Sequence, residues 1–480
     1  MNQHLTEHMV RRRAWTSVHG PSAAKRRSRN RFFHSLVDRL VASQVVPGSS
    51  VVDLGCADGS TLQACQPSLG VGVDLDGLAL ERARQTNPGM TFIETTIEEL
   101  DGAPIADPDY FVMSMLLDEV YDIQEILRQV HNWSERKTRV VLVSYSRLWR
   151  PLIRLTEVMR LKSRAEGENY VPWIEVENML ALEGFEVTKR VDGVLLPVYI
   201  PALSMVVNRW VAPLPLVRAL SLIRVTVARP IQDQPEPLTS VSVVVAARNE
   251  SGHIRELIDR VPVMAERQEL IFVEGNSTDD TWGVIQEAVR DYDGDPRMTL
   301  HALQQPGKGK GDAVRTGFDA ASGDVLMILD ADLSVPPEEL PRFVEALRDD
   351  SCEFANGSRL VYPMDAKAMR FLNLLGNKFF GNLFSYLLGQ PVRDTLCGTK
   401  VLRRSDYDRV AANRGIIGDF DPFGDFDLLF GASLLGLRIR DIPVHYKERR
   451  YGATNISRFS HGALLLRMSA VAASKLKFVG

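Results

Sequence analysis

The chain has 480 residues, of which 45% are hydrophobic and 25% are charged, and its formal net charge is −4 at pH 7. This length is too great for a single hydrophobic core, so two or three domains are expected. The composition is ordinary for a soluble globular protein, and the near-neutral charge gives no reason to expect nucleic-acid binding.

The N-terminus and the cysteines indicate a cytoplasmic location. The opening MNQHLTEHMVRRRAW lacks the apolar core of a signal peptide, and no apolar run reaches the roughly 20 residues that span a bilayer. Arg11–Arg13 and Lys25–Arg31 form a basic arm within residues 1–30, which is either solvated or able to touch anionic lipid. The four cysteines have no paired spacing, so we expect neither disulfides nor a zinc site and a reducing compartment; they are Cys56, Cys65, Cys352 and Cys397.

Strand-like apolar runs alternate with helical patterns in both halves of the chain, which predicts an α/β fold with two domains and mostly parallel sheets. The expected strands are 51–54, 70–75, 91–93, 110–113 and 140–144, then 241–247, 269–275, 298–304 and 324–330. A proline-rich polar seam, RPIQDQPEPLTS, separates the two series. The expected segments are an arm (1–30), a first domain (31–230), a linker (231–239), a second domain (240–455) and a C-terminal helix (456–480).

The first candidate site is the segment VVDLGCADGS, residues 51–60, which reads as a strand, a glycine-bearing turn and a helix start. Gly55 and Gly59 allow a ligand to approach the backbone closely. The next strand ends in Asp74, about 20 residues after Asp53, where a carboxylate can accept hydrogen bonds from ribose hydroxyls. The pair of features favours a nucleoside cofactor over a purely structural turn.

This half resembles the class I S-adenosylmethionine-dependent methyltransferases, a Rossmann-like fold, with DLGCADG matching their first motif. The resemblance implies that Gly55, Ala57 and Gly59 line the methionine end of S-adenosylmethionine, with Asp53 close by and Asp74 on the ribose. The chain has Thr96 where the family often has an acid near the adenine, and Glu98 is the candidate substitute. Asp118 or Glu119 is a candidate base or helix cap. A non-catalytic cofactor-binding scaffold is the alternative function.

The second candidate site gathers polar residues at strand ends in the C-terminal half. Glu250 lies in AARNES after the first strand of this half, and Glu274 ends the next strand, where a carboxylate can accept nucleobase N–H groups. Lys308, Lys310 and Arg315 surround small residues at a helix start, a setting that suits a diphosphate. Asp330 and Asp332 end a long apolar strand as Asp-Ala-Asp, which predicts a Mg²⁺ or Mn²⁺ site beside that diphosphate.

These motifs resemble glycosyltransferase family 2 with the GT-A fold, and more narrowly the dolichyl- and polyprenyl-phosphate mannose and glucose synthases. The resemblance covers residues 240–455 and includes GSR, RDTLCGTK, GDFDLLF and ERRYGATNIS. It implies a GDP- or UDP-sugar donor contacted by Glu250, Glu274, Lys310, Arg315, Asp330 and Asp394. It also implies catalytic roles for Asp332, Asp425, Asp427, Arg359 and Arg449, with the metal on Asp330 and Asp332.

Two kinds of acceptor are compatible with an inverting transfer, and they differ in their charge. A polyprenyl phosphate is already an anion and needs cations, for which Arg359, Arg370 and Arg449 are candidates. A hydroxyl acceptor on a glycan or soluble molecule needs a base, for which Asp425 or Asp427 is available. The tail FSHGALLLRMSAVAASKLKFV has apolar residues at helical spacing, which suits an amphipathic helix at a membrane interface or docked on a domain. Peripheral contact with the inner face of the plasma membrane is therefore left open.

Overall fold

The computed structural model is described here for most of the chain, namely residues 10, 13–14, 27–117, 120–151, 155, 171–232, 234, 236–363, 371–417, 424, 426–447 and 458–479. The chain divides into two compact units, each built on its own seven-stranded sheet. Unit 1 comprises Met1–Gln232 with Ser474–Gly480, and unit 2 comprises Asp233–Ala473.

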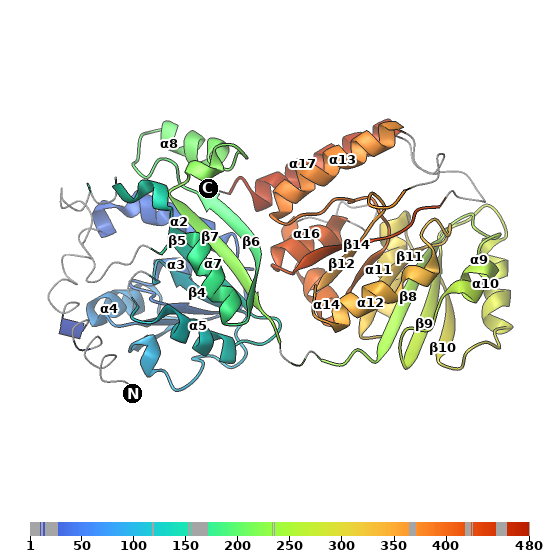
Figure 1. Ribbon diagram of the computed structural model, residues 1–480, viewed down its shortest axis with the longest axis horizontal. Helices are drawn as coiled ribbons and strands as arrows, with labels where there is room; N and C mark the ends of the chain where they lie inside the picture. Colours follow the sequence, from blue (N-terminus) through green and yellow to red (C-terminus); the bar gives the residue numbers. More distant parts are fainter. Residues whose placement is uncertain are drawn as a thin grey trace. The chain divides into compact units, whose positions relative to one another are not determined.

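Unit 1 is a mixed sheet covered by helices (Figure 1). Its strands are β1 (Ser50–Leu54), β2 (Leu69–Asp74), β3 (Thr91–Glu94), β4 (Tyr110–Ser114), β5 (Arg139–Tyr145), β6 (Phe185–Gly193) and β7 (Ile223–Pro230). Its helices include α2 (Arg31–Ala42), α3 (Ser60–Ala64), α4 (Gly77–Thr86), α5 (Ile123–Asn132), α7 (Trp173–Leu182) and α8 (Leu203–Val206). The strand order is β3-β2-β1-β4-β5-β7-β6, with β7 antiparallel to both neighbours and the other pairs parallel.

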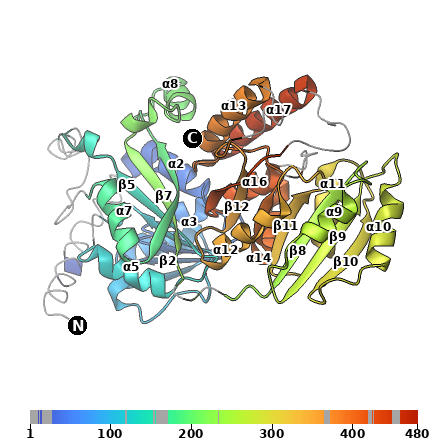
Figure 2. The same ribbon diagram turned by 45° about the vertical axis from the view of Figure 1, so that its right-hand side comes forward.

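Unit 2 repeats this plan with different details (Figure 2). Its strands are β8 (Ser240–Ala247), β9 (Arg267–Glu274), β10 (Met298–Gln304), β11 (Val325–Asp330), β12 (Phe354–Ser358), β13 (Lys400–Arg403) and β14 (Ile439–Pro443). Its helices are α9 (Ile254–Arg260), α10 (Thr281–Arg290), α11 (Lys310–Ala320), α12 (Pro341–Arg348), α13 (Phe371–Leu388), α14 (Arg404–Ala412), α15 (Arg414–Ile417), α16 (Phe426–Leu434) and α17 (Arg458–Leu476). The order is β10-β9-β8-β11-β13-β12-β14, and only β13 runs antiparallel to its neighbours.

Each sheet has a point at which the strand order reverses, between β1 and β4 in unit 1 and between β8 and β11 in unit 2. The central strands are buried on both faces, which is why they read as continuous Val, Ile and Leu runs rather than alternating ones. In open α/β sheets, ligands bind beyond the carboxyl ends of the strands at such a reversal. The motifs found in the sequence follow β1 and β11, so both lie at these positions.

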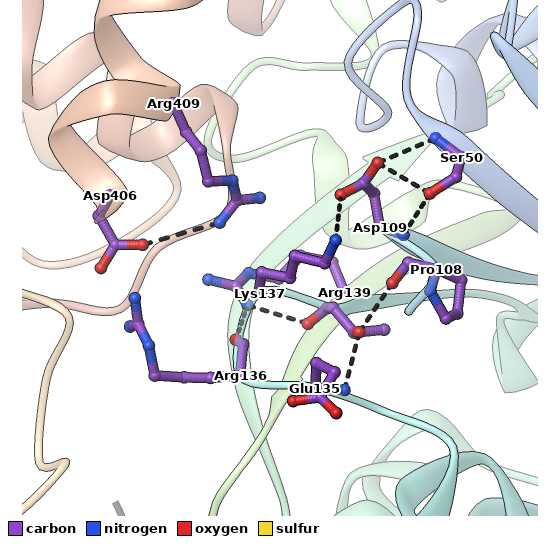
Figure 3. Close-up of polar contacts among 10 residues, drawn as sticks. Ser50, Pro108, Asp109, Glu135, Arg136, Lys137, Arg139, Asp406 and Arg409 are labelled. Carbon is purple, nitrogen blue, oxygen red and sulfur yellow. Dashed lines mark hydrogen bonds and ion pairs between the residues drawn. The ribbon is translucent and has the colours of Figure 1, made fainter. Parts of the chain in front are cut away.

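The opposite, amino-terminal edge of the unit 1 sheet is closed by ordinary structural contacts (Figure 3). The Asp109 carboxylate accepts hydrogen bonds from the backbone N–H and hydroxyl of Ser50, each at 2.9 Å, and lies 3.6 Å from the Lys137 ammonium group. The side chain of Arg139 is fully buried and donates to the carbonyls of Arg136 and Thr138. These contacts tie the starts of β1 and β5 to the loops that precede β4 and β5.

Candidate functional sites

The turn after β1 has a backbone conformation that allows a ligand to approach closely, as the glycines in the sequence predict. Gly55, Ala57 and Gly59 all have positive φ, at 80°, 48° and 74°. A Cβ atom on Gly55 would lie 2.9 Å from the side chain of Leu116, so only glycine fits there. The N–H of Gly55 donates to the Val73 carbonyl at 2.8 Å, which ties the turn to β2.

Two predicted cofactor residues, Asp53 and Asp74, flank this turn but differ in their surroundings. Asp74 accepts hydrogen bonds from the N–H groups of Ala57 and Asp76, both at 2.8 Å, so it shapes the turn. Asp53 is fully buried and neither of its carboxyl oxygens has a hydrogen-bond partner. Burial, followed by the nearby Asp38 carboxylate, raises the pKa of Asp53 to about 8.

Helix α2 and the segment before it add residues to this site that the sequence analysis did not identify. The Arg27 guanidinium lies 3.0 Å from the Asp58 carboxylate and donates to the Ser60 hydroxyl at 2.7 Å, although it was assigned to a solvated basic arm. Asp38 on α2 accepts a 2.7 Å hydrogen bond from Thr61, and burial raises the pKa of Asp38. No motif spacing links α2 to the turn, so only the fold reveals them.

On the adenine side of the predicted cofactor, the positions after β3 are buried and acidic. Thr96 is 4% exposed, and one carboxyl oxygen of Glu98 is buried without a hydrogen-bond partner. The suggested bases Asp118 and Glu119 lie outside the described residues. Next to Glu98, the carboxylate of Glu99 accepts hydrogen bonds from the Arg13 guanidinium at 2.6 and 2.8 Å.

In unit 2, the Asp-Ala-Asp motif follows β11 and meets the start of α11. The Lys310 ammonium lies 2.7 Å from a carboxyl oxygen of Asp330. Burial works against ionisation of Asp330, but Lys310 and then Arg359 lower its pKa below the usual value. Asp332 accepts a 3.0 Å hydrogen bond from the N–H of Ser334, while Lys308 is exposed. Both motif carboxylates therefore stand at the ligand edge with a cation beside the first.

Gly398 packs directly over this pair. A Cβ atom there would lie 2.1 Å from an oxygen of Asp330 and 2.5 Å from the Lys310 nitrogen. Any side chain at position 398 would therefore displace the Lys310–Asp330 pair. The backbone before β13 thus forms one wall of the site.

Arg359 and Asp394, predicted as separate catalytic and donor-binding residues, form one buried ion pair. The guanidinium donates two hydrogen bonds to the carboxylate, at 2.7 and 2.8 Å, and the Arg359 N–H adds a third at 3.0 Å. Asp394 is fully buried, and the guanidinium lies 4.9 Å from the centre of the Tyr446 ring. Burial opposes ionisation of Asp394, but Arg359 keeps its pKa low. Asp394 therefore holds the Arg359 side chain in place.

The two predicted nucleotide residues near β8 and β9 are also engaged in protein contacts. Glu274 is 3% exposed, and its oxygens accept from the N–H of Ser277 at 2.5 Å and from the Gln304 amide at 3.3 Å. Burial opposes ionisation of Glu274, yet these hydrogen bonds lower its pKa. Glu250 is 6% exposed and lies 2.8 Å from the ring of His253.

Arg315 of α11 and Asp427 of α16, assigned separately to diphosphate binding and base catalysis, are neighbours. Their side chains are 3.9 Å apart, and the Arg414 guanidinium donates to the same Asp427 oxygen at 3.1 Å. Asp427 is thus held between two arginines. The remaining predicted residues, Asp425, Arg449 and Arg370, lie outside the described residues.

Comparisons with known proteins found a family model that matches each half of the chain. Residues 242–411 match the family model for glycosyl transferase family 2, and residues 25–190 match the model for a methyltransferase domain. The chain thus contains one region similar to methyltransferase domains and a second region similar to family 2 glycosyltransferases. The expected fold classes of the two halves are thus confirmed, and both point to transferase chemistry.

The curated relatives match the glycosyltransferase domain. A dolichol-phosphate mannosyltransferase of Pyrococcus furiosus is 31% identical over 45% of this chain and 59% of its own length. A dolichyl-phosphate hexose transferase of Haloferax volcanii is 28% identical over 47% of this chain and 90% of its own. An undecaprenyl-phosphate 4-deoxy-4-formamido-L-arabinose transferase of Yersinia pestis is 26% identical over 46% and 64%. The chain thus spans about three fifths of the first and third of these relatives.

Similar solved structures exist for both units. A methyltransferase from Mesorhizobium loti is 20% identical and covers 40% of this chain and 95% of its own, with a TM-score of 0.31. A glucosyl-3-phosphoglycerate synthase from M. tuberculosis is 20% identical and covers 50% and 81%, with a TM-score of 0.36.

Proposed function

We propose that the glycosyltransferase domain transfers a sugar from a GDP- or UDP-sugar to a polyprenyl phosphate, with Mg²⁺ or Mn²⁺ held by Asp330 and Asp332. The observation that carries the proposal is the Lys310–Asp330 contact of 2.7 Å at the carboxyl end of β11, beside the buried Arg359. All three matched relatives are named as sugar transferases acting with dolichyl or undecaprenyl phosphate.

The charges of this site suit a diphosphate bound together with a divalent cation. Carboxylates and cations alternate here among the described residues, the acids being Asp330, Asp332 and Asp394 and the cations Lys310, Arg359 and the buried Lys400. The described residues contain no cluster of three or more His, Cys, Asp or Glu ligands. Mg²⁺ is typically held by one or two carboxylates together with substrate phosphates and waters, so the donor set fits. The cation would neutralise the departing diphosphate.

We propose the following roles for the chain's own residues. Lys310 and Arg315 at the start of α11 contact the donor diphosphate, while Glu250 and Glu274 lie on the nucleoside side. A phosphate oxygen of the acceptor attacks the anomeric carbon as the bond from that carbon to the diphosphate breaks, with inversion. Arg359 and Arg449 balance the negative charge of acceptor and leaving group. Asp394 acts as a positioning residue for Arg359.

A phosphate acceptor agrees with the surroundings of Asp427 better than a hydroxyl acceptor does. A general base must be able to take up a proton in the reacting geometry. Asp427 is paired with Arg315 and Arg414 and is 8% exposed, an arrangement that suits orientation of the two arginines. Asp425 remains the candidate base if the acceptor is a hydroxyl.

The test is label transfer from a panel of GDP- and UDP-hexoses to polyprenyl phosphate, with Mg²⁺, Mn²⁺ or chelator, by wild type and Asp332→Asn. We expect organic-phase label that needs the cation and falls by at least about 100-fold in the variant. Asp349→Asn, which makes the same change at an exposed position on the end of α12, is the matched control. Donor turnover without organic-phase label would reject the lipid acceptor and select a hydroxyl, and unchanged activity in Asp332→Asn would reject the metal role.

We also propose that the methyltransferase domain binds S-adenosylmethionine at the turn after β1. The cofactor carries a sulfonium and an ammonium group, and the turn offers the buried, unpartnered carboxylate of Asp53 with Asp74 beside it. Gly55, Ala57 and Gly59 supply the close backbone approach. S-adenosylmethionine supplies an activated methyl group to an acceptor that the residues do not identify.

Binding and methyl transfer are measured separately in this domain. Calorimetric titration with S-adenosylmethionine should show binding by wild type and at least about tenfold weaker binding by Asp74→Ala, whose ribose contacts are removed. Transfer of label from S-adenosylmethionine with a labelled methyl group into a lipid or glycan fraction identifies the acceptor. Binding without turnover on any acceptor selects the scaffold function instead, and no binding rejects the cofactor site.

A further inference from the structure

The connection between β6 and β7 in unit 1, residues 194–222, exposes an unusual number of apolar side chains. We call this segment the apolar lobe; it includes α8 and runs as a loop and short helical turns between the two strands (Figure 1). Ten of its large hydrophobic side chains are more than 40% exposed: Val198, Tyr199, Ile200, Leu203, Met205, Val206, Trp210, Leu214, Leu216 and Leu220. Exposed apolar side chains concentrated in one segment in this way indicate an interaction site.

The lobe also buries its polar side chains, the reverse of the usual arrangement in water. Asn208 is 5% exposed; its oxygen accepts from the N–H groups of Leu195 and Leu196, both at 2.9 Å, and its amide donates to the Leu196 carbonyl. Ser204 is fully buried, accepts from the N–H of Ile200 and donates to the Val198 carbonyl. The lobe is therefore a built structure whose internal hydrogen bonds turn the apolar side chains outward.

Charge identifies the kind of partner. Residues 194–222 contain no acidic residue and two arginines, Arg209 and Arg218. Arg218 is exposed, Arg209 lies 5.6 Å from the centre of the Trp210 ring, and the exposed Arg147 lies on the turn whose Trp149 donates to the Leu220 carbonyl. Apolar side chains combined with Trp, Tyr and Arg, and with no acids, are typical of surfaces that lie in the headgroup region of anionic membranes.

We propose that the apolar lobe docks the protein on an anionic lipid bilayer, with its apolar side chains in the acyl boundary and its arginines at the lipid phosphates. The described residues include no helix long and apolar enough to cross a membrane, so this is contact with one face. The C-terminal helix, which the sequence suggested for this role, buries Leu465, Met468 and Ala472 and exposes Leu466.

The lobe adjoins the proposed cofactor site, which gives the docking a consequence for methyl transfer. Tyr199 of the lobe packs edge-on against Phe32 of α2, with ring centres 5.3 Å apart. Helix α2 in turn covers α3, which begins at the glycine turn. A bilayer under the lobe therefore lies near the methyl donor, where a lipid-borne acceptor is within reach. The docking itself stands whether or not either transfer reaction is as proposed.

The experiment is flotation of the full chain with phosphatidylcholine vesicles, with and without phosphatidylglycerol, and without any polyprenyl phosphate. We expect binding that depends on the anionic lipid, and an increase of about tenfold in the lipid needed for half-maximal binding of Leu216→Glu. Arg218→Gln should weaken binding about fivefold. The matched control is Ile174→Glu on α7, which places the same charge at another exposed apolar position of the same unit.

Other outcomes assign the surface differently. Loss of binding in Leu466→Glu on α17, with Leu216→Glu unaffected, would overturn the proposal in favour of the C-terminal helix. Absence of vesicle binding by wild type, with a self-association that Leu216→Glu abolishes, would overturn it in favour of a contact between protein chains. Unchanged S-adenosylmethionine binding by Leu216→Glu shows that the variant is folded. A loss of flotation in this variant is then a loss of lipid binding and not a result of unfolding.

Discussion

The buried carboxyl group of Asp53 gives the sharpest test of the N-terminal site. It is fully buried, has no hydrogen-bond partner, and its pKa is raised from 3.8 to about 8 by burial and by neighbouring carboxylates. We predict that Asp53→Asn stabilises the ligand-free protein at pH 8, leaves its stability near that of wild type at pH 4, and weakens S-adenosylmethionine binding. A residue that costs stability and is needed for a ligand belongs to a binding site.

The size of the effect follows from the two pKa values. Below about pH 4 the carboxyl is protonated in both the folded and the unfolded chain, so its titration contributes no difference. Between about pH 4 and pH 8 the folded state retains a proton that the unfolded state has lost, so the free energy of unfolding falls by about 1.4 kcal/mol per pH unit. The upper limit is on the order of 5 kcal/mol at pH 8, reduced where Asp38 shares the proton. Asparagine cannot ionise and escapes this loss.

The assay is calorimetric unfolding of wild type and Asp53→Asn from pH 4.5 to pH 8.5, following the transition of the methyltransferase domain. The difference in Tm between the two proteins should grow steadily with pH and level off above about pH 8. Asp101→Asn, at an exposed position of the same domain, should show no such trend. A difference that does not change with pH, or an Asp53→Asn protein that is less stable than wild type at pH 8, would refute the reasoning.

Three further predictions concern ligand binding and the glycosyltransferase site. Because a bound cation favours the ionised form of Asp53, affinity for S-adenosylmethionine in calorimetry should rise by up to about tenfold per pH unit between pH 6 and pH 8, and not in Asp53→Asn. Asp394→Asn and Arg359→Lys should each lower kcat for sugar transfer on the order of 100-fold, because the two-point hydrogen bond between the side chains is lost. The double variant should have a kcat no lower than either single variant. Additive losses would show that the two residues act independently. Gly398→Ala should weaken nucleotide-sugar binding at least about tenfold without loss of fold. The control is Gly415→Ala, where no atom lies within 4 Å of the new methyl group, and it should bind normally. Equal affinities of the two variants would show that the backbone at position 398 is not part of the site.

The central strands were predictable because each is buried on both faces and reads as an uninterrupted apolar run. Strands β1, β4, β8 and β11 were all expected within two residues of their observed bounds. Strands β6, β7, β12, β13 and β14 were not identified. The burial of β6 follows no regular period, and β12 to β14 are short. Motifs at strand ends could be placed at the ligand edge from topology alone.

Side-chain pairing could not be predicted in the same way. Arg359 and Asp394 are 35 residues apart and were assigned different roles, yet they form one ion pair in the fold. Arg27 was read as part of a solvated arm, because its sequence neighbours are also basic, and it pairs with Asp58 instead. Strand order brings distant loops together, but which oxygen meets which nitrogen depends on loop geometry that residue types do not determine.

The two proposed ligand sites occupy the same topological position, but their proposed ligands have opposite charges. At the reversal point of the methyltransferase sheet, one arginine faces several acids, which favours a cationic cofactor; they are Arg27, Asp38, Asp53, Asp58 and Asp74. At the reversal point of the glycosyltransferase sheet, carboxylates and cations lie side by side, which suits the proposed binding of a diphosphate together with a divalent cation. Topology therefore decides where each ligand lies, and the local charge balance decides which ligand it is. By this reasoning the loss of one positive charge, as in S-adenosylhomocysteine, should weaken binding to the first site and leave the second unaffected.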